Sequence, residues 1–295
     1  MGVACTMRCS ALHPQDGSGR HGGHVDGFDS MGIMNAPTHP SPSRRGPTCV
    51  LEAVGIHKSY RTGRRGPEIP VLRDVSVRIH EGEMVAVIGP SGSGKSTLLY
   101  CLSALEHVTR GEVRMDGQDL GSMKGPGLAR LRRDKIGFVF QQFNLIPSLT
   151  AAENVALPAR LARRPHSPQA VDGALERVGL TGQRSRHPAE LSGGQQQRVA
   201  IARVLADEPD IVFADEPTGA LDTRNSRQVL ALLRAAADDG RAVVMVTHDL
   251  DAASQADRVL VLRDGRLCAE LPRPTVLQLL EALESSAGPI EGHGA

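Results

Sequence analysis

The segment Gly89-Pro-Ser-Gly-Ser-Gly-Lys-Ser96 is the part of this chain that says most about its fold. It matches the pattern G-x-x-x-x-G-K-[ST], follows the apolar run Met84–Ile88 and precedes a predicted helix over Ser96–Leu105. A buried strand, a glycine-rich loop and a helix in this order direct backbone N–H groups and the positive end of the helix toward one point. The stretch therefore predicts a phosphate-binding loop, in which Lys95 contacts the β- and γ-phosphates and the Ser96 hydroxyl binds Mg²⁺.

Other short apolar runs predict the sheet to which this loop belongs. They alternate with helical stretches, which is typical of a parallel sheet covered by helices on both faces. Further along the chain these runs are Ile136–Phe140, Ile211–Ala214 and Ala242–Val246. Two earlier segments, Cys49–Gly55 and Val71–Ile79, alternate as β-strands do, with a loop over Thr62–Pro70 between them. These patterns predict an α/β fold.

Composition excludes several classes of protein. The 34 Lys and Arg against 33 Asp and Glu leave a net charge of +1, too small a surplus for binding nucleic-acid phosphates. No apolar run approaches the roughly 20 residues of a membrane-spanning helix. The five cysteines are scattered and include no C-x-x-C pair, as in a protein of a reducing compartment. We expect a cytoplasmic protein that binds no nucleic acid and does not cross a membrane by itself.

The two ends of the chain differ from its middle. Residues 1–47 are rich in Gly, Pro, Ser and His and poor in large apolar side chains, which predicts a disordered leader. The predicted folded domain covers residues 48–270. Residues 271–295 are expected to form a short helix over Thr275–Leu283 and a tail. Whether Met31 or Met34 is the true start stays open.

Two carboxylates follow the apolar run Ile211–Ala214. A buried strand that ends in Asp215 places this carboxylate beside the metal of the phosphate-binding loop. The next residue, Glu216, points elsewhere and is placed to polarise an attacking water. Together with the loop, this pair predicts hydrolysis of a nucleoside triphosphate.

A third motif, Leu191-Ser-Gly-Gly-Gln-Gln-Gln-Arg198, precedes a predicted helix over Val199–Leu205. With this motif the chain resembles the ATP-binding subunits of ABC transporters, whose signature is LSGGQ. The resemblance covers about Val50 to Arg266. It implies a P-loop NTPase fold of the ABC ATPase type, with a RecA-like parallel-sheet core, an N-terminal antiparallel β subdomain and a helical signature subdomain over about 147–203.

The resemblance also implies roles for individual residues. Tyr60 would stack on adenine, Asp222 belongs to the D-loop and His248 is the switch histidine at the γ-phosphate. The implied catalytic residues are Glu216, His248 and Lys95, and the implied metal ligands are Ser96, Asp215 and Gln141, the glutamine of the Q-loop. The implied nucleotide-binding residues are Tyr60, Gly89, Pro90, Ser91, Gly92, Ser93, Gly94, Lys95, Ser96, Thr97, Gln141, Asp215, Ser192, Gly193, Gly194, Gln195 and Asp222.

The implied cofactors are ATP and Mg²⁺, and the implied partners are a second ATP-binding subunit and an integral membrane permease. Two subunits pack head to tail, so that Ser192 and Gly194 of one contact ATP held by Lys95 of the other. An identical second subunit is expected, and a different one stays open. The permease is expected to dock near Gln141 and Phe143–Leu149, at the cytoplasmic face of the cell membrane.

Two segments narrow the resemblance further. Phe138–Val155 and Asp215–Asp222 are similar to those of the lipoprotein-releasing and macrolide-exporter ATPases. We therefore expect export, or extraction of a substrate from the membrane, with the cargo unnamed. The alternative is an ABC ATPase of a non-transport membrane complex of the cell-division type. A chromosome-maintenance ATPase is excluded because no sustained heptads separate Lys95 from Ser192.

Overall fold

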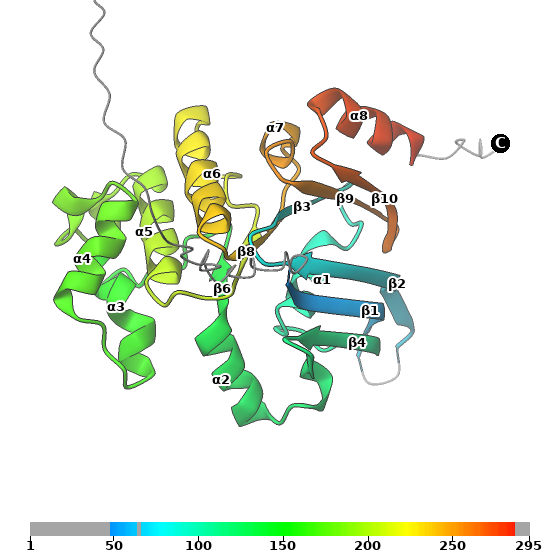
Figure 1. Cartoon of the computed structure of the whole chain (residues 1–295), viewed down its shortest axis with the longest axis horizontal. Helices are drawn as coiled ribbons and strands as arrows, with labels where there is room; N and C mark the ends of the chain where they lie inside the picture. The colour runs from blue at the N-terminus through cyan, green and yellow to red at the C-terminus, as the bar shows by residue number, and fades with distance from the viewer. Residues whose placement is uncertain (1–47, 64–65, 287–295) are drawn as a thin grey trace, which may run out of the picture. The chain divides into compact units, whose positions relative to one another are not determined.

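The computed structural model describes residues 48–63 and 66–286. Within them, the first sheet has four antiparallel strands in the order β2-β1-β4-β5 (Figure 1). Its strands are β1 (Cys49–Arg61), β2 (Glu68–His80), β4 (Arg110–Met115) and β5 (Gln118–Asp119). This sheet is the antiparallel β subdomain that the resemblance implies.

The second sheet has six strands in the order β10-β9-β3-β8-β7-β6. All neighbours are parallel except β10, which runs antiparallel to β9. The strands are β3 (Met84–Ile88), β6 (Ile136–Val139), β7 (Ile211–Asp215), β8 (Ala242–Val246), β9 (Arg258–Arg263) and β10 (Arg266–Pro272). The predicted α/β fold with a parallel core is confirmed.

Helices pack on both faces of the parallel sheet. Figure 1 shows α3, α4 and α5 grouped on the side away from the antiparallel sheet. The α-helices of the described residues are α1 (Lys95–Leu102), α2 (Gly125–Lys135), α3 (Ala151–Leu161), α4 (Pro168–Arg177), α5 (Gly193–Leu205), α6 (Thr223–Asp238), α7 (Leu250–Ala253) and α8 (Val276–Ser285). Single turns of 3₁₀-helix occur at Leu120–Ser122, Thr181–Gln183 and Pro188–Glu190.

The core consists of two apolar clusters, one on each face of the parallel sheet. Alternate residues of β3 enter different clusters: Met84 joins the cluster that contains α5 and α6, whereas Val85 joins the one that contains α1 and the antiparallel sheet. Every residue of β3, β7 and β8 is buried. Strands buried on both faces have continuous apolar sequences, which explains why these runs were recognisable.

Several elements differ from the predicted ones. Strand β2 begins at Glu68, inside the predicted loop Thr62–Pro70, and β1 runs to Arg61, directly before this loop, because Arg61 pairs with Glu68 across the hairpin. These end residues are polar and exposed, so no apolar alternation marks them. Helix α1 ends at Leu102 and not at Leu105, since Ala104 adopts a positive φ of 56° that a helix does not tolerate. Strands β4, β5, β9 and β10 were not predicted.

Some predictions lie outside the described residues or stay untested. The leader at residues 1–47 and the end of the tail at 287–295 are not described. Helix α8 overlaps the predicted helix Thr275–Leu283, with Thr275 as its N-cap. None of the helices in residues 48–63 and 66–286 is long and apolar enough to cross a bilayer. The domain boundaries remain predictions.

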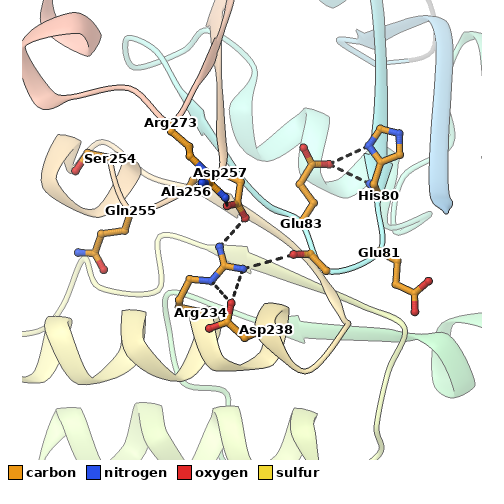
Figure 2. A pocket seen from close by; sticks show the side chains of 11 residues that line it. His80, Glu81, Glu83, Arg234, Asp238, Ser254, Gln255, Ala256, Asp257 and Arg273 are labelled. Carbon is orange, nitrogen blue, oxygen red and sulfur yellow. Dashed lines mark hydrogen bonds and ion pairs between the residues drawn. The ribbon is translucent and has the colours of Figure 1, made fainter. Parts of the chain in front are cut away.

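A cavity of about 730 Å³ is lined by residues that precede β3 and β9 and by residues of α6 (Figure 2). The phosphate-binding loop follows the other end of β3. Arg234 of α6 donates to Asp257 at 2.6 Å and forms an ion pair with Asp238 at 2.9 Å. Arg273 donates to the same Asp257 at 3.1 Å, and the backbone N–H of Met84 donates to it at 3.0 Å. Because these charges pair with each other, the cluster joins α6 to the strand ends.

Candidate active site

The loop after β3 has the backbone that a phosphate-binding loop requires. Gly89, Gly92 and Gly94 have φ values of 152°, 78° and 100°, which side-chain-bearing residues rarely adopt. A Cβ atom at Gly89 would lie 1.9 Å from the carbonyl oxygen of Leu262 on β9. Only glycine fits at this position, so β9 and the loop are in direct backbone contact.

Lys95 is the first residue of α1, and its ammonium group turns back over the loop. Its Nζ donates to the carbonyl oxygens of Gly89 at 2.9 Å and Pro90 at 3.0 Å. Lys95 forms no ion pair with any residue in the described ranges. Its charge, together with the positive end of α1, is therefore available to an anion in the loop.

Asp215 ends β7 and is a buried residue, 8% exposed. The hydroxyl of Ser96 donates to Oδ1 at 3.1 Å, and the hydroxyl of Tyr100 donates to Oδ2 at 2.8 Å. Burial, reinforced by the bond to Asp215, raises the pKa of Tyr100 to about 12. Tyr100 thus remains a hydrogen-bond donor at neutral pH.

Glu216, the next residue, leaves the strand with a φ of 47°. Its backbone N–H donates to the carbonyl of Val246, at the end of the neighbouring strand β8. This positive φ turns the side chain of Glu216 away from Asp215 and toward His248, whose Nδ1 lies 2.9 Å from Oε2 of Glu216. His248 is 71% exposed, so the pair lies at an open edge of the sheet.

The signature motif begins helix α5. Ser192 is its N-cap and forms a capping box with Gln195: Ser192 Oγ accepts from the Gln195 N–H at 3.3 Å, and Gln195 Oε1 accepts from the Ser192 N–H at 2.9 Å. A Cβ atom at Gly194 would lie 2.2 Å from the side chain of Asn225. Asn225 in turn donates to Asp222, the N-cap of α6. The signature and the predicted D-loop are therefore in contact within one chain.

The remaining predicted residues occupy the edges of the site. The ring of Tyr60 is 39% exposed, and Lys58 Nζ lies 4.8 Å from its centroid. Gln141 is exposed, and its side-chain amide lies against Gly219: a Cβ atom added to Gly219 would be 3.2 Å from Nε2 of Gln141. Among the described contacts, Gln141 does not reach Ser96 or Asp215, so the structure does not join it to the other two predicted metal ligands.

Strand order brings the central residues together. Strands β3, β8 and β7 are neighbours. Lys95 comes after β3, His248 comes after β8, and β7 ends in Asp215, which Glu216 follows. Helix α5 instead packs on α3, α4, α6 and β6, and Figure 1 shows it apart from α1. Ser192 therefore belongs to a different part of the molecule from Lys95.

Sequence reasoning did not identify three residues that the structure places at the site. These are Tyr100 at Asp215, Gln197 at Pro217, the residue after Glu216, and Asn225 at Gly194. A signal was present for one of them. Tyr100 is four residues after Ser96, and residues at this spacing share one face of a helix.

The oxygen atoms around Asp215 suit a hard divalent cation. Mg²⁺ prefers carboxylate, hydroxyl, phosphate and water oxygens, and it is usually bound by one or two carboxylates plus substrate phosphates. Ser96 and Asp215 supply two such oxygens beside the loop. The described residues contain no cluster of three His, Cys, Asp or Glu side chains that forms a metal site alone. The residues present fit a cation that arrives with nucleotide.

A model of the ABC transporter family matches residues 72–219, which include the loop, Asp215 and the signature. The chain belongs to the ABC transporter family. The cassette is similar to the macrolide export ATP-binding/permease protein MacB of Rhodospirillum rubrum, with 46% identity over 232 residues, 77% of this chain and 35% of that protein. It spans only about a third of the length of this relative.

Other relatives match over nearly their full length. YvrO of Bacillus subtilis, an uncharacterized ABC transporter ATP-binding protein, is 46% identical over 220 residues, 74% of this chain and 95% of YvrO. The ATP-binding cassette MJ0796 was solved as a dimer in a post-hydrolysis state bound to ADP and Pi. It superposes on this chain with a TM-score of 0.69 and is 41% identical in sequence. The match covers 76% of this chain and 99% of MJ0796. The chain is therefore an ATP-binding cassette with the fold of an ABC ATPase.

Proposed function

We propose that the cassette binds and hydrolyses Mg²⁺-ATP as one half of a head-to-tail dimer and drives a membrane permease. One observation carries this proposal. Lys95, Asp215 and Glu216 lie at one end of the parallel strands, whereas Ser192 caps α5, which packs on α3, α4 and α6 and lies apart from α1. A complete site then requires Ser192 from a second copy, and the cassette MJ0796 is itself a dimer with ADP and Pi.

The phosphate-binding loop holds the nucleotide in this proposal. When nucleotide binds, Lys95 gives up its hydrogen bonds to the carbonyls of Gly89 and Pro90 and donates to the β- and γ-phosphates. The new hydrogen bonds are stronger because the phosphate oxygens are negatively charged. The backbone N–H groups of Gly89 and of residues 91–97 bind phosphate oxygens at the positive end of α1, whereas Pro90 has no N–H to donate. The exposed ring of Tyr60, with Lys58 against it, offers a surface for adenine stacking.

Ser96 and Asp215 would hold Mg²⁺, which neutralises the charge that develops on the phosphates during transfer. The hydroxyl and the carboxylate are already hydrogen-bonded at 3.1 Å. Gln141 is proposed as a further ligand, which requires its side chain to turn from Gly219 toward the nucleotide.

Glu216 is the proposed catalytic base, and His248 orients it. An ionised carboxylate only accepts hydrogen bonds, so the contact at 2.9 Å requires a proton on His248 Nδ1. This bond fixes one oxygen of Glu216 and leaves the other to accept a proton from water. The exposed His248 ring can also contact the γ-phosphate.

The partner subunit completes the site. The N-terminus of α5 consists of Ser192, Gly193, Gly194 and Gln195. Its backbone N–H groups and the positive end of the helix dipole favour a bound anion. In the proposed dimer this anion is ATP bound to Lys95 of the second copy. Asp222 lies beside the signature through Asn225, so the D-loop takes part in the same interface.

The segment Phe143–Leu149 is the proposed permease contact. Its backbone is held by two side chains of the helical part: Arg203 donates to the carbonyls of Phe143 and Asn144, and Asn154 donates to those of Ile146 and Leu149. A force on this segment therefore reaches α3 and α5 directly. The MacB relative is named an export ATP-binding/permease protein, which supports export or extraction from the membrane, driven from the cytoplasmic face.

Light scattering after size exclusion tests the proposal. The variant Glu216→Gln keeps the size of the side chain but removes the base, so ATP should bind and remain intact. This variant should be a dimer with Mg²⁺-ATP and a monomer with ADP. The added change Ser192→Arg places charge and bulk at the shared site and should abolish the dimer while the monomer still binds ATP. A dimer that forms equally with ADP, or that survives Ser192→Arg, would contradict the proposal.

A further inference from the structure

Two hydroxyl groups of helix α1 hold the carboxylate of Asp215. Ser96 donates to Oδ1 at 3.1 Å, and Tyr100 donates to Oδ2 at 2.8 Å. Because Ser96 and Tyr100 are four residues apart, both side chains lie on the same face of α1. The two oxygens of Asp215 are thus fixed by one rigid element, and the plane of the carboxylate is defined.

The carboxylate of Asp215 has no cation beside it. Asp215 as a whole residue is 8% exposed, and its carboxylate forms no ion pair with any residue of the described part of the chain. A buried carboxylate is costly unless hydrogen bonds or a cation compensate for its lost hydration. The hydroxyl bonds supply part of this compensation and leave the charge available to a divalent ion.

The position of the Tyr100 hydroxyl is itself set by packing. The ring of Tyr100 lies 5.9 Å from that of Phe138 at a tilt of 41°, and Phe138 stacks on Phe140 at 4.2 Å. Phe138 also lies 6.3 Å from Phe213, in the strand that ends in Asp215. Phe138 packs against the ring of Tyr100 and is itself held by Phe140 and Phe213, so this side of the Tyr100 ring is supported.

We propose that Tyr100 is a positioning residue of the Mg²⁺ site, whose hydroxyl holds Asp215 in the orientation that the ion requires. The inference rests on the proposed function. Ser96 is a proposed ligand of the same ion, so its contact with Asp215 is part of the coordination shell. Tyr100 is not a ligand, and its bond to Oδ2 orients the carboxylate before the ion arrives. Partners of this kind orient metal ligands, and their loss typically weakens metal binding 10- to 100-fold.

The test measures Mn²⁺ binding to the ADP-bound protein by electron paramagnetic resonance, with Mn²⁺ as the probe for the Mg²⁺ site. The variant Tyr100→Phe removes the hydroxyl and keeps the ring on Phe138. We expect the Kd for Mn²⁺ to rise by about 10-fold, at the lower end of the range for such partners. In steady-state hydrolysis, the Mg²⁺ concentration for half-maximal rate should rise, while kcat at saturating Mg²⁺ remains close to that of the wild type.

Ser103→Ala is the matched control. The Ser103 hydroxyl is buried and donates to the backbone carbonyl of Tyr100 at 3.2 Å, so its loss removes a bond to the same residue without touching Asp215. This variant should bind Mn²⁺ as the wild type does. Wild-type Mn²⁺ affinity in Tyr100→Phe, or equal losses in both variants, would overturn the inference. If the wild type itself binds no Mn²⁺ with nucleotide, the proposed function fails instead.

Discussion

Gln197 of helix α5 donates from Nε2 to the carbonyl oxygen of Pro217 at 2.9 Å. The signature helix is thereby bonded to the residue that directly follows Glu216. Gln197 is fully buried, and its Oε1 has no hydrogen-bond partner among the described residues. A buried oxygen without a hydrogen-bond partner lowers the stability of the folded state. We therefore expect that Gln197 serves to hold the turn at Glu216 and contributes little to the stability of the fold.

The variant Gln197→Met tests this relationship. The change removes the bond to Pro217, which costs about 1–3 kcal/mol for a buried acceptor, but it also removes the unpaired oxygen, so the two effects partly offset each other. We expect the free energy of unfolding in urea to change little while ATP turnover falls, because the Glu216 turn loses its support. A variant that is strongly destabilised but turns over ATP normally when folded would contradict this prediction.

Lys95→Ala should abolish tight nucleotide binding. A hydrogen bond to a charged group is worth about 1.5–3 kcal/mol, which corresponds to a Kd for ATP roughly 10- to 100-fold higher. Binding is measured by titration with a fluorescent ATP analogue, and turnover by phosphate release. Lys124→Ala, at an exposed lysine before α2, is the control and should bind as the wild type does. Full turnover in Lys95→Ala would refute the assignment of the loop.

Asp257→Asn should destabilise the fold without affecting the active site. Burial opposes ionisation of Asp257, but the bonds from Arg234, Met84 and Arg273 outweigh it and lower the pKa of this carboxyl. Loss of the charge should cost about 1–3 kcal/mol in the free energy of unfolding. Asp238→Asn is the matched control, because Asp238 pairs with the same Arg234 but is 66% exposed, and exposed pairs contribute about 0–1 kcal/mol.

The effect of Asp257→Asn should depend on pH. A carboxyl with a lowered pKa stabilises the folded state above its unfolded pKa, and this contribution is lost as the pH falls through the folded-state value. The difference in unfolding free energy between wild type and variant should thus be constant near neutrality and shrink below about pH 4. A difference that grows on acidification would contradict the ion-pair explanation.

Removal of residues 1–47 should leave ATP hydrolysis intact. The segment has few large apolar side chains with which to pack on the cassette. A chain that starts at Thr48 should match the full chain in melting temperature and in turnover. Loss of either property would show that the leader contributes to the folded domain.

Much of the fold was recognisable from sequence, and the failures have physical causes. Met84–Ile88 and Ala242–Val246 were predicted with the bounds that the structure has, because both strands are buried on both faces and fully apolar. Edge elements were missed: β10 (Arg266–Pro272) alternates between exposed and half-buried residues. The end of α1 was misplaced because nothing in the sequence signals the positive φ of Ala104.

The phosphate-binding loop, the Asp215–Glu216 pair and a helix at the signature motif were recognisable in the sequence, although this helix begins at Gly193 and not at the predicted Val199. These features depend on conformations within a few residues, such as the positive φ values of the loop glycines and the capping box of Ser192. The contact of Tyr100 with Asp215, 115 residues away, and that of Gln197 with Pro217 arise only when the chain folds. Such contacts depend on β7 lying next to β8 and β8 next to β3, an order that local spacing does not encode.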